Sequence, residues 1–344
     1  MKTYRLLMLL VVSVLVLASC EHDVAMETTV HEDGSLDKVI VFENEDASKN
    51  IMGLTEKTGW TKSVKQKENK PDTVKGKEVI VTFKKTFASA QEANTELAVS
   101  SDTLFRVSGT FEKKFRWFYT YLYYADTYHA INRMKLPIDD YVAPEDYAFI
   151  DRLPAEGKAI SKADSLYLSE LNKKLFDSYG LKAIYEEYFL INVYLIKKHQ
   201  LEARWLDTLN RHKHDLFIRM ERSKDMEGNF MLNYMDSLHI PLPYKELAGE
   251  YKALSKPIES KTSFISTAND GKYVHRINMP WTVINTNADS VINNQLVWRP
   301  PVIKFLIKDY TMYAESRQMN YWAVALSAVL VGLTIYAFAR KRNA

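Results

Sequence analysis

The sequence predicts an α+β protein in which a mostly antiparallel β-sheet domain carries a large helical insertion and is followed by one C-terminal transmembrane helix. Three observations predict this class. Segments rich in β-branched residues lie toward both ends of the chain, a long stretch with helical periodicity separates them, and an uncharged apolar run stands near the C-terminus. We therefore expect the sheet domain to be built from two separate parts of the chain.

Composition excludes several classes of protein. The chain has 344 residues, of which 47% are hydrophobic, and 46 Lys and Arg nearly balance 43 Asp and Glu to give a net charge of +3. The apolar content excludes a disordered protein, and the small net charge speaks against a nucleic-acid partner. Because the chain has a single Cys, it cannot form an internal disulfide.

Residues 1–19 are predicted to be a lipoprotein signal peptide that is cleaved. Lys2 and Arg5 give a positive start, and the apolar run Leu6–Ala18 would make a helix of about 20 Å, too short to span a bilayer core. Leu17-Ala18-Ser19-Cys20 resembles the bacterial lipobox, in which a lipid is attached to the Cys thiol. Cys20 is therefore the predicted lipid attachment site. The alternative is an uncleaved signal anchor with an incidental Cys.

Residues 20–129 are predicted to form the first β-rich part of an extracytoplasmic domain. Asp33-Gly34 is a strong turn signal between two strand-like segments, because Gly tolerates the positive φ that a tight turn needs. The expected elements are strands at 24–30, 36–43, 78–87 and 103–118, and a short helix at 89–99.

Residues 116–129, RWFYTYLYYADTYH, are the most aromatic stretch of the chain. As a strand, this segment places aromatic side chains on both faces. Two interpretations follow. It is either a central strand covered on both sides, or a strand that lines a pocket for an apolar ligand, with tyrosine hydroxyls as the polar points.

Residues 130–260 are predicted to be a helical insertion bounded by prolines. Between Ser161, a plausible N-cap, and Arg222 the apolar residues follow a helical period. The segment Leu181–Ile196 is so apolar that it must be largely covered. Two interpretations stay open: the helices pack against the sheet, or they dock a membrane protein partner.

Strands are expected to return in residues 261–318 and to complete the domain. A turn is expected at Asn269-Asp270-Gly271, and the last strand would lead the chain to the membrane. The expected strands are Thr262–Thr267, Lys272–Ile277, Gln295–Trp298 and a closing strand at Val302–Ser316.

Residues 319–339 are predicted to be a transmembrane helix. No residue from Trp322 to Ala339 is charged, and the 21 residues would span about 31 Å, the thickness of a bilayer core. Three basic residues follow, and the positive-inside rule places this tail, residues 340–344, in the cytoplasm. The alternative is a buried core helix of a soluble domain.

One late segment carries the pattern Gly-x-Tyr…Pro-x-x-Val-x-x-Thr-Asn-Ala-x-x-Val-x-x-Asn-x-x-x-Trp. Together with the hairpin that follows Cys20, it resembles the LppM family of bacterial envelope lipoproteins. The resemblance implies an α+β lipoprotein domain with a lipid-binding role, and it transfers no functional residue. The helical insertion departs from the family pattern, and Pro280-Trp281 stands where the family has Pro-Gly. The matching residues are Gly271, Tyr273, Pro280, Val283, Thr286, Asn287, Ala288, Val291, Asn294 and Trp298.

The sequence contains almost no recognisable catalytic or metal-binding motif. The chain has no Gly-rich phosphate loop, no Gly-x-Ser-x-Gly and no His-Glu-x-x-His. His212 and His214 would lie about 200° apart on a helix and could not share a metal ion. Asp126 and His129 could pair one helical turn apart, but an acid–base pair without a nucleophile or a metal ion is common in proteins and does not indicate catalysis. The acids around Pro144 do not have the regular ligand spacing of a known calcium-binding loop. We expect no catalytic residue, no cofactor and no metal ion, and a protein that is not an enzyme.

Together these features predict a bacterial envelope lipoprotein in the cytoplasmic (inner) membrane, held by a lipid on Cys20 and by one C-terminal helix, with its domain outside the cytoplasm. The predicted function is the non-catalytic binding of a lipid or apolar ligand. Two alternatives remain, a scaffold or accessory subunit of a membrane protein complex and an unrecognised envelope hydrolase. The expected partners are the bilayer, a lipid or apolar ligand, and a membrane protein bound through the helical insertion.

Overall fold

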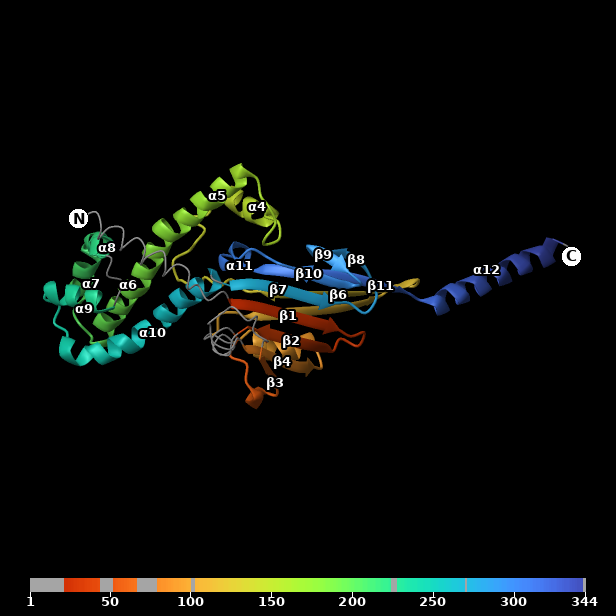
Figure 1. The fold of residues 1–344 in the computed structure, drawn as a ribbon, viewed down its shortest axis with the longest axis horizontal. Coiled ribbons are helices and arrows are strands. Elements are labelled where there is room, and N and C mark those ends of the chain that lie inside the picture. Colours follow the sequence, from red (N-terminus) through yellow and green to blue (C-terminus); the bar gives the residue numbers. More distant parts are fainter. Residues whose placement is uncertain are drawn as a thin grey trace. The chain divides into compact units, whose positions relative to one another are not determined.

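The computed structural model describes residues 22–43, 52–66, 79–99, 103–223, 228–269 and 271–342. The chain divides into two compact units (Figure 1). The β unit comprises Met1–His129, Asp270–Phe305 and Asp309–Ala344, and the helical unit comprises Ala130–Asn269 with Leu306–Lys308. The predicted α+β class with antiparallel-rich sheets is confirmed. The predicted signal peptide and Cys20 lie outside the described residues.

The larger sheet of the β unit has seven strands in the order β3-β4-β2-β1-β7-β10-β9. β1 and β2 form the predicted hairpin, whose loop contains Gly34 at a φ of 93°, a conformation that favours glycine. β1 also pairs in parallel with β7, so segments from both ends of the chain share one sheet. The strands are β1 His22–Val30, β2 Leu36–Phe42, β3 Thr61–Gln66, β4 Val79–Phe87, β7 Gly271–Asn278, β9 Ser290–Ile292 and β10 Gln295–Trp298.

The smaller sheet has four antiparallel strands in the order β5-β6-β11-β8. The two sheets pack face to face, and Asp126 of β6 accordingly bonds to side chains of β2 and β7 across the interface between them. Aromatic contacts continue the core, with Phe105 lying 5.1 Å from Tyr128 and 5.0 Å from Tyr273 between ring centroids. The strands are β5 Val107–Phe115, β6 Tyr119–Tyr128, β8 Thr282–Thr286 and β11 Tyr310–Met319.

Short helices complete the β unit. α3 (Ala90–Leu97) confirms the helix expected at 89–99, and its N-cap Ser89 accepts a hydrogen bond from the Glu92 backbone N–H. A 3₁₀ turn, η1, spans Glu56–Thr58, and α11 spans Ile303–Leu306.

The helical unit forms its own apolar core. Helix α6 buries most of its length against α7 to α10, which accounts for the apolar run that the sequence singled out. Ser161 caps α5 as predicted, since its Oγ accepts from the Asp164 N–H at 3.0 Å. The elements are α4 Pro144–Arg152, α5 Lys162–Lys173, η2 Lys174–Gly180, α6 Leu181–Lys198, α7 Ala203–Arg211, α8 Lys213–Ser223, α9 Gly228–Ser237 and α10 Tyr244–Asn269.

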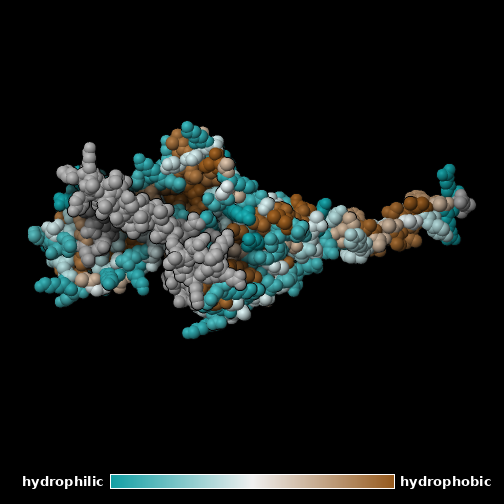
Figure 2. Space-filling model, viewed as in Figure 1, coloured by the Kyte–Doolittle hydropathy of each residue, from teal (hydrophilic) through white to brown (hydrophobic). Residues whose placement is uncertain are grey.

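The C-terminal helix α12 spans Tyr321–Arg342 and is long and apolar enough to cross a membrane. Its 22 residues correspond to about 33 Å. The side chains along it are exposed, and Figure 2 shows an apolar surface over much of its length. A soluble-core helix would bury such a surface, so the exposure agrees with the predicted membrane span.

Two predicted strands are corrected. Thr262–Thr267 belongs to helix α10. Ile258 and Ala268 are buried and Ile265 is half-buried on the same helical face, and this packing outweighs the strand preference of the β-branched residues. Pro257 lies inside the same helix. The closing strand does not begin at Val302. The segment there forms α11, with Pro301 at the start of the turn where proline is tolerated, and β11 begins at Tyr310.

Candidate functional site

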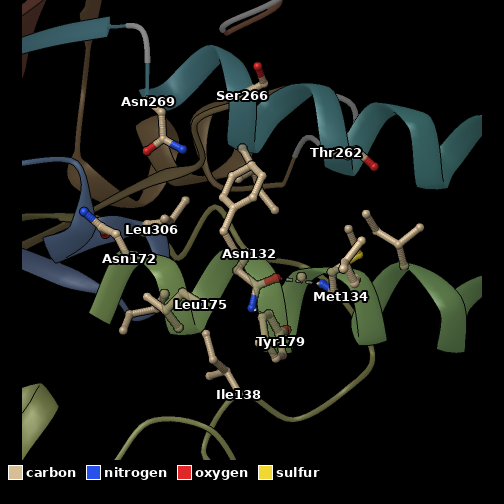
Figure 3. A pocket seen from close by; sticks show the side chains of 16 residues that line it. Asn132, Met134, Ile138, Asn172, Leu175, Tyr179, Thr262, Ser266, Asn269 and Leu306 are labelled. Carbon is tan, nitrogen blue, oxygen red and sulfur yellow. Dashed lines mark hydrogen bonds between the residues drawn. The ribbon is translucent and has the colours of Figure 1, made fainter. Parts of the chain in front are cut away.

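The helical unit contains an apolar pocket of about 690 Å³. Small-molecule sites typically enclose about 300–1,000 Å³. Two helical segments face each other across the pocket, the continuous helix α5–η2–α6 and the C-terminal half of α10 (Figure 3). Residues of the segment 132–138, together with Leu306 and Ile307, complete the lining.

The wall formed by η2 is a π-helical segment that joins α5 to α6 without a break. It contributes Leu175, Phe176 and Tyr179 to the pocket. Gly180 ends the segment, and a Cβ at this position would lie 3.3 Å from the Leu175 carbonyl oxygen. Because π segments often occur at functional sites, the coincidence of this irregular turn with the pocket marks the region as the candidate site.

The pocket has an apolar floor and an uncharged polar rim. The floor consists of buried apolar and aromatic side chains, and the rim consists of exposed amides and hydroxyls. No lining residue carries a charge within the described part of the chain. Such a site suits an amphiphile whose tail enters the pocket and whose head stays at the rim. The floor residues are Leu175, Tyr179, Ile184 and Ile307, and the rim residues are Asn172, Thr262, Ser266 and Asn269.

The deeper polar groups of the pocket are already bonded within the protein. Asn132 Nδ2 donates to the Tyr179 hydroxyl at 2.7 Å, which donates in turn to the Leu136 carbonyl at 3.0 Å. Burial raises the pKa of Tyr179, so the phenol is neutral. By contrast, Asn172 and Ser266 make no side-chain hydrogen bond to any described residue, so the rim offers an amide and a hydroxyl to a ligand.

The aromatic stretch 116–129 does not line this pocket. It supplies β6, whose Leu122, Tyr124 and Tyr128 are buried between the two sheets. Tyr123 lies on the opposite face, half-buried and stacked on Tyr313 at 6.1 Å. The structure therefore favours the interpretation as a central strand and places the apolar pocket elsewhere in the chain.

The other residues considered from the sequence do not come together. His212 is the C-cap residue that follows α7, and His214 lies in α8. No group of three His, Cys, Asp or Glu suited to a metal ion occurs among the described residues. His129 pairs with Asp309 at 2.9 Å rather than with Asp126. Among the acids around Pro144, Asp146 accepts from Tyr167 and Lys174, so its carboxylate is engaged in side-chain contacts.

A buried polar cluster that sequence reasoning missed lies in the core of the β unit. Asp126 Oδ1 accepts from Lys38 Nζ at 2.9 Å and from the Tyr124 hydroxyl at 2.7 Å. Its Oδ2 accepts from Thr28 Oγ1 at 2.9 Å and bonds to His275 Nε2 at 3.0 Å. One signal was available: Lys38 occupies an inward position of the alternating strand β2, where an apolar residue is expected.

The charge states of this cluster follow from its burial and its hydrogen bonds. Burial by itself raises the pKa of Asp126, but the Lys38 ammonium and the bonds from His275 and Tyr124 outweigh it and hold the pKa well below its ordinary value. Burial lowers the pKa of His275, so the ring is neutral. Because the carboxylate only accepts, Nε2 carries the proton, and Nδ1 accepts from the Tyr128 hydroxyl at 3.1 Å.

This cluster is closed to solutes. Lys38 is 1% exposed, and Asp126 and His275 are 0% exposed, so no member can reach a substrate in this structure. Its bonds connect β1, β2 and β7 of the larger sheet to β6 of the smaller one. We therefore assign it to the joining of the sheets and keep the pocket as the candidate functional site.

Comparison with known proteins adds little. No family model and no curated protein matches the chain. A solved structure that does match is the NMR structure of the folded domain of LppM from Mycobacterium tuberculosis, with 9% sequence identity over 87% of this chain and 91% of that one and a TM-score of 0.26. A TM-score of that size does not establish a common fold. The resemblance to the LppM family therefore stays a prediction.

Proposed function

We propose that this protein is a membrane-anchored bacterial envelope lipoprotein that binds a lipid or another apolar amphiphile in the pocket of its helical unit. The proposal combines three features. A lipobox-like sequence ends at Cys20, α12 is suited to span a membrane, and the pocket offers an apolar interior. In this proposal the lipid on Cys20 and α12 share the cytoplasmic membrane, and both units, apart from α12 and the basic tail that follows it, lie outside the cytoplasm.

The uncharged lining of the pocket is the observation that carries the binding proposal. An acyl chain gains free energy by leaving water for the floor around Leu175 and Ile184, at about 0.8 kcal/mol for each buried CH₂. The free rim groups of Asn172 and Ser266 would orient a polar head. Because no lining residue is charged, we propose a ligand whose head is neutral or keeps its charge in the surrounding water.

The scaffold alternative was motivated by the apolar helices of the insertion. In the structure, apolar residues of α6 such as Tyr185, Leu195 and Ile196 pack within the core of the helical unit itself. These three side chains are therefore covered, whereas Leu190 and Tyr194 of the same helix are exposed. The pocket therefore gives the stronger basis for a function than the helices do.

A photocrosslinking experiment tests the binding proposal. The full chain in phosphatidylcholine nanodiscs is mixed with a palmitate analogue that carries a diazirine and an alkyne, and the crosslinked peptides are mapped by mass spectrometry. We expect crosslinks at 172–184 and 262–269. The variant Ile265→Trp fills the pocket and should reduce these crosslinks several-fold, while crosslinks on α12, which contacts lipid in any case, should not change.

The matched control is Leu190→Trp, which places the same side chain on an exposed position of α6 outside the pocket lining. This variant should crosslink like the wild type. Crosslinks confined to α12, or pocket crosslinks that Ile265→Trp leaves unchanged, would contradict the proposal.

The anchor is tested separately by mass spectrometry of the mature protein extracted in detergent. We expect Cys20 to be the first residue and to carry the mass of acyl chains, and we expect Cys20→Ser to lose that mass while α12 still retains the protein in the membrane. A mature protein with an unmodified Cys20 would contradict the anchor and leave the pocket experiment unaffected.

A further inference from the structure

The hairpin β5–β6 ends in an aromatic tip, which we define as residues Phe115–Phe118. Phe115 is 58% exposed, Trp117 45% and Phe118 48%. Soluble domains rarely expose large aromatic side chains so close together, and such groups mark interaction surfaces. We therefore expect these aromatic side chains to contact another surface.

The tip lies against the first turns of α12. The ring of Phe115 stacks on that of Trp322 with centroids 6.1 Å apart and an interplanar angle of 8°, and Trp117 meets Trp322 edge-on at 5.7 Å. Trp117 Nε1 donates to Ser327 Oγ at 2.8 Å. Ser327 lies five residues beyond Trp322, about 8 Å further along the helix axis. The tip thus extends along the segment that is suited to span the membrane.

Asn320, the residue before α12, satisfies the backbone of the tip. Its side-chain Nδ2 donates to the carbonyl oxygens of Arg116 at 2.8 Å and Trp117 at 3.2 Å, and its backbone N–H donates to the carbonyl of Phe118 at 2.9 Å. Its Oδ1 accepts from Thr120 Oγ1 at 2.9 Å. A turn in water can leave carbonyls to solvent, whereas a turn near hydrocarbon must bond them internally.

Basic residues lie within and beside the aromatic tip. Lys113, Lys114 and Arg116 are exposed on the strand end and turn that lead into it. Glu112 pairs with Lys114 at 2.5 Å, and Lys113 Nζ donates to the backbone carbonyl of Glu32 at 2.9 Å. Three cations thus stand beside the acids Glu112 and Glu32, which leaves a positive balance at the hairpin end. Aromatic rings beside Lys and Arg are typical of the membrane interface, where the rings reach the acyl boundary and the cations meet anionic headgroups.

We propose that the tip Phe115–Phe118 inserts into the headgroup–acyl boundary of an anionic bilayer, beside the outer end of α12, and so forms a membrane contact of the β unit in addition to α12. The inference rests on α12 spanning the membrane and does not depend on ligand binding by the pocket. Interfacial elements enter a bilayer by about 5–10 Å, which agrees with the distance that the tip covers along α12. Through this contact, Asn320 joins the hairpin and the helix in one orientation.

Depth-dependent fluorescence quenching tests the insertion. Phe118→Cys is labelled with the fluorophore NBD in the full chain and reconstituted in vesicles of phosphatidylcholine and phosphatidylglycerol. We expect a blue-shifted emission, strong quenching by lipids that carry a doxyl group near the headgroup, and weak quenching by aqueous iodide. The wild type, in which Cys20 is the single Cys, is the labelling blank.

The control is Val64→Cys, an exposed position on β3, a strand that lies away from α12 (Figure 1). It should respond to iodide and not to doxyl lipid. An iodide-sensitive label at position 118 would overturn the proposal. A blue-shifted label that doxyl lipid does not quench would also overturn it, because the tip would then be covered by protein. Should Phe118→Cys fail to reconstitute, Trp117→Phe in vesicles of brominated lipid replaces it, and the proposal requires this variant to lose part of the lipid-quenched tryptophan emission.

Discussion

The β unit and the helical unit fill their interiors in opposite ways. The β unit closes its two sheets around an ion pair, Lys38 with Asp126, in which both carboxylate oxygens are bonded. The helical unit packs apolar side chains, contains a π-helical segment and keeps a pocket of about 690 Å³. The ion pair fixes the spacing of the two sheets, because each buried polar group must meet its partner, whereas the pocket of the helical unit leaves part of the apolar lining uncovered. The comparison predicts that the ion pair stabilises the β unit, and it agrees with the proposal that a ligand enters the pocket of the helical unit.

Removing the Asp126 carboxylate should have the largest effect, because it destabilises the β unit and leaves the helical unit unchanged. Asp126→Ala leaves the Lys38 ammonium buried without its counter-ion, a change that typically costs about 3–5 kcal/mol of the free energy of unfolding. Hydrogen exchange with mass spectrometry reports both units in one sample. We expect peptides of β1, β2 and β7 to lose protection and peptides of α6 and α10 to keep it.

Two further variants control this prediction. Asp309→Ala removes the exposed partner of His129 and should change protection little, because exposed ion pairs contribute about 0–1 kcal/mol. Lys38→Met combined with Asp126→Leu should recover part of the loss, since no unpaired charge remains. An Asp126→Ala protein no less protected than Asp309→Ala, or one that loses protection equally in both units, would show that the cluster does not hold the β unit together.

Lowering the pH should destabilise the β unit rather than the helical unit, by less than Asp126→Ala does. The pKa of His275 is lowered by burial, so below about pH 6.5 the unfolded chain binds a proton that the folded β unit does not. The contribution of His275 to the free energy of unfolding of the β unit is therefore fully present above this pH. It falls as the pH drops, by up to about 1.4 kcal/mol for each pH unit. Asp126, whose pKa is also lowered, adds a loss in the same direction below about pH 4.

The measurement is the denaturant midpoint of the β unit between pH 7 and pH 5, followed by exchange at peptides of β7. His275→Asn removes the titrating ring and should flatten the dependence, although its stability at pH 7 is lower because Asp126 loses a donor. A β unit with the same stability at pH 7 and pH 5, or a variant that keeps the wild-type slope, would assign the acid sensitivity to another group.

Local signals in the sequence predicted much of the fold. Asp33-Gly34 between alternating strands predicted β1 and β2, Ser89 and Ser161 marked helix starts, and the uncharged run near the C-terminus marked α12. Each of these features is decided within a few residues. They needed no knowledge of distant parts of the chain.

Features set by distant contacts could not be predicted. Asp126 lies 88 residues from Lys38 and 149 from His275, and no local pattern joins them. The segment Thr262–Thr267 has the composition of a strand, but the packing of Ile258 and Ala268 makes it a helix. The pocket depends on both effects, because α10 forms one wall and the π turn of η2 the other.

Two glycines test the special character of this π turn, and they give the smallest expected effect. Gly249 lies in the interior of α10, and a Cβ added to it would have no atom within 4 Å, so Gly249→Ala should stabilise the helical unit by about 0.5–1 kcal/mol, the ordinary gain for a helix. At Gly180 the new methyl group would lie 3.3 Å from the Leu175 carbonyl oxygen, so Gly180→Ala should gain nothing or lose stability. Hydrogen exchange at peptides of α6 and α10 measures both changes. Equal stabilisation by the two substitutions would mean that η2 accommodates a side chain as a regular helix does, and the π turn would then not distinguish this wall of the pocket from the other helices of the helical unit.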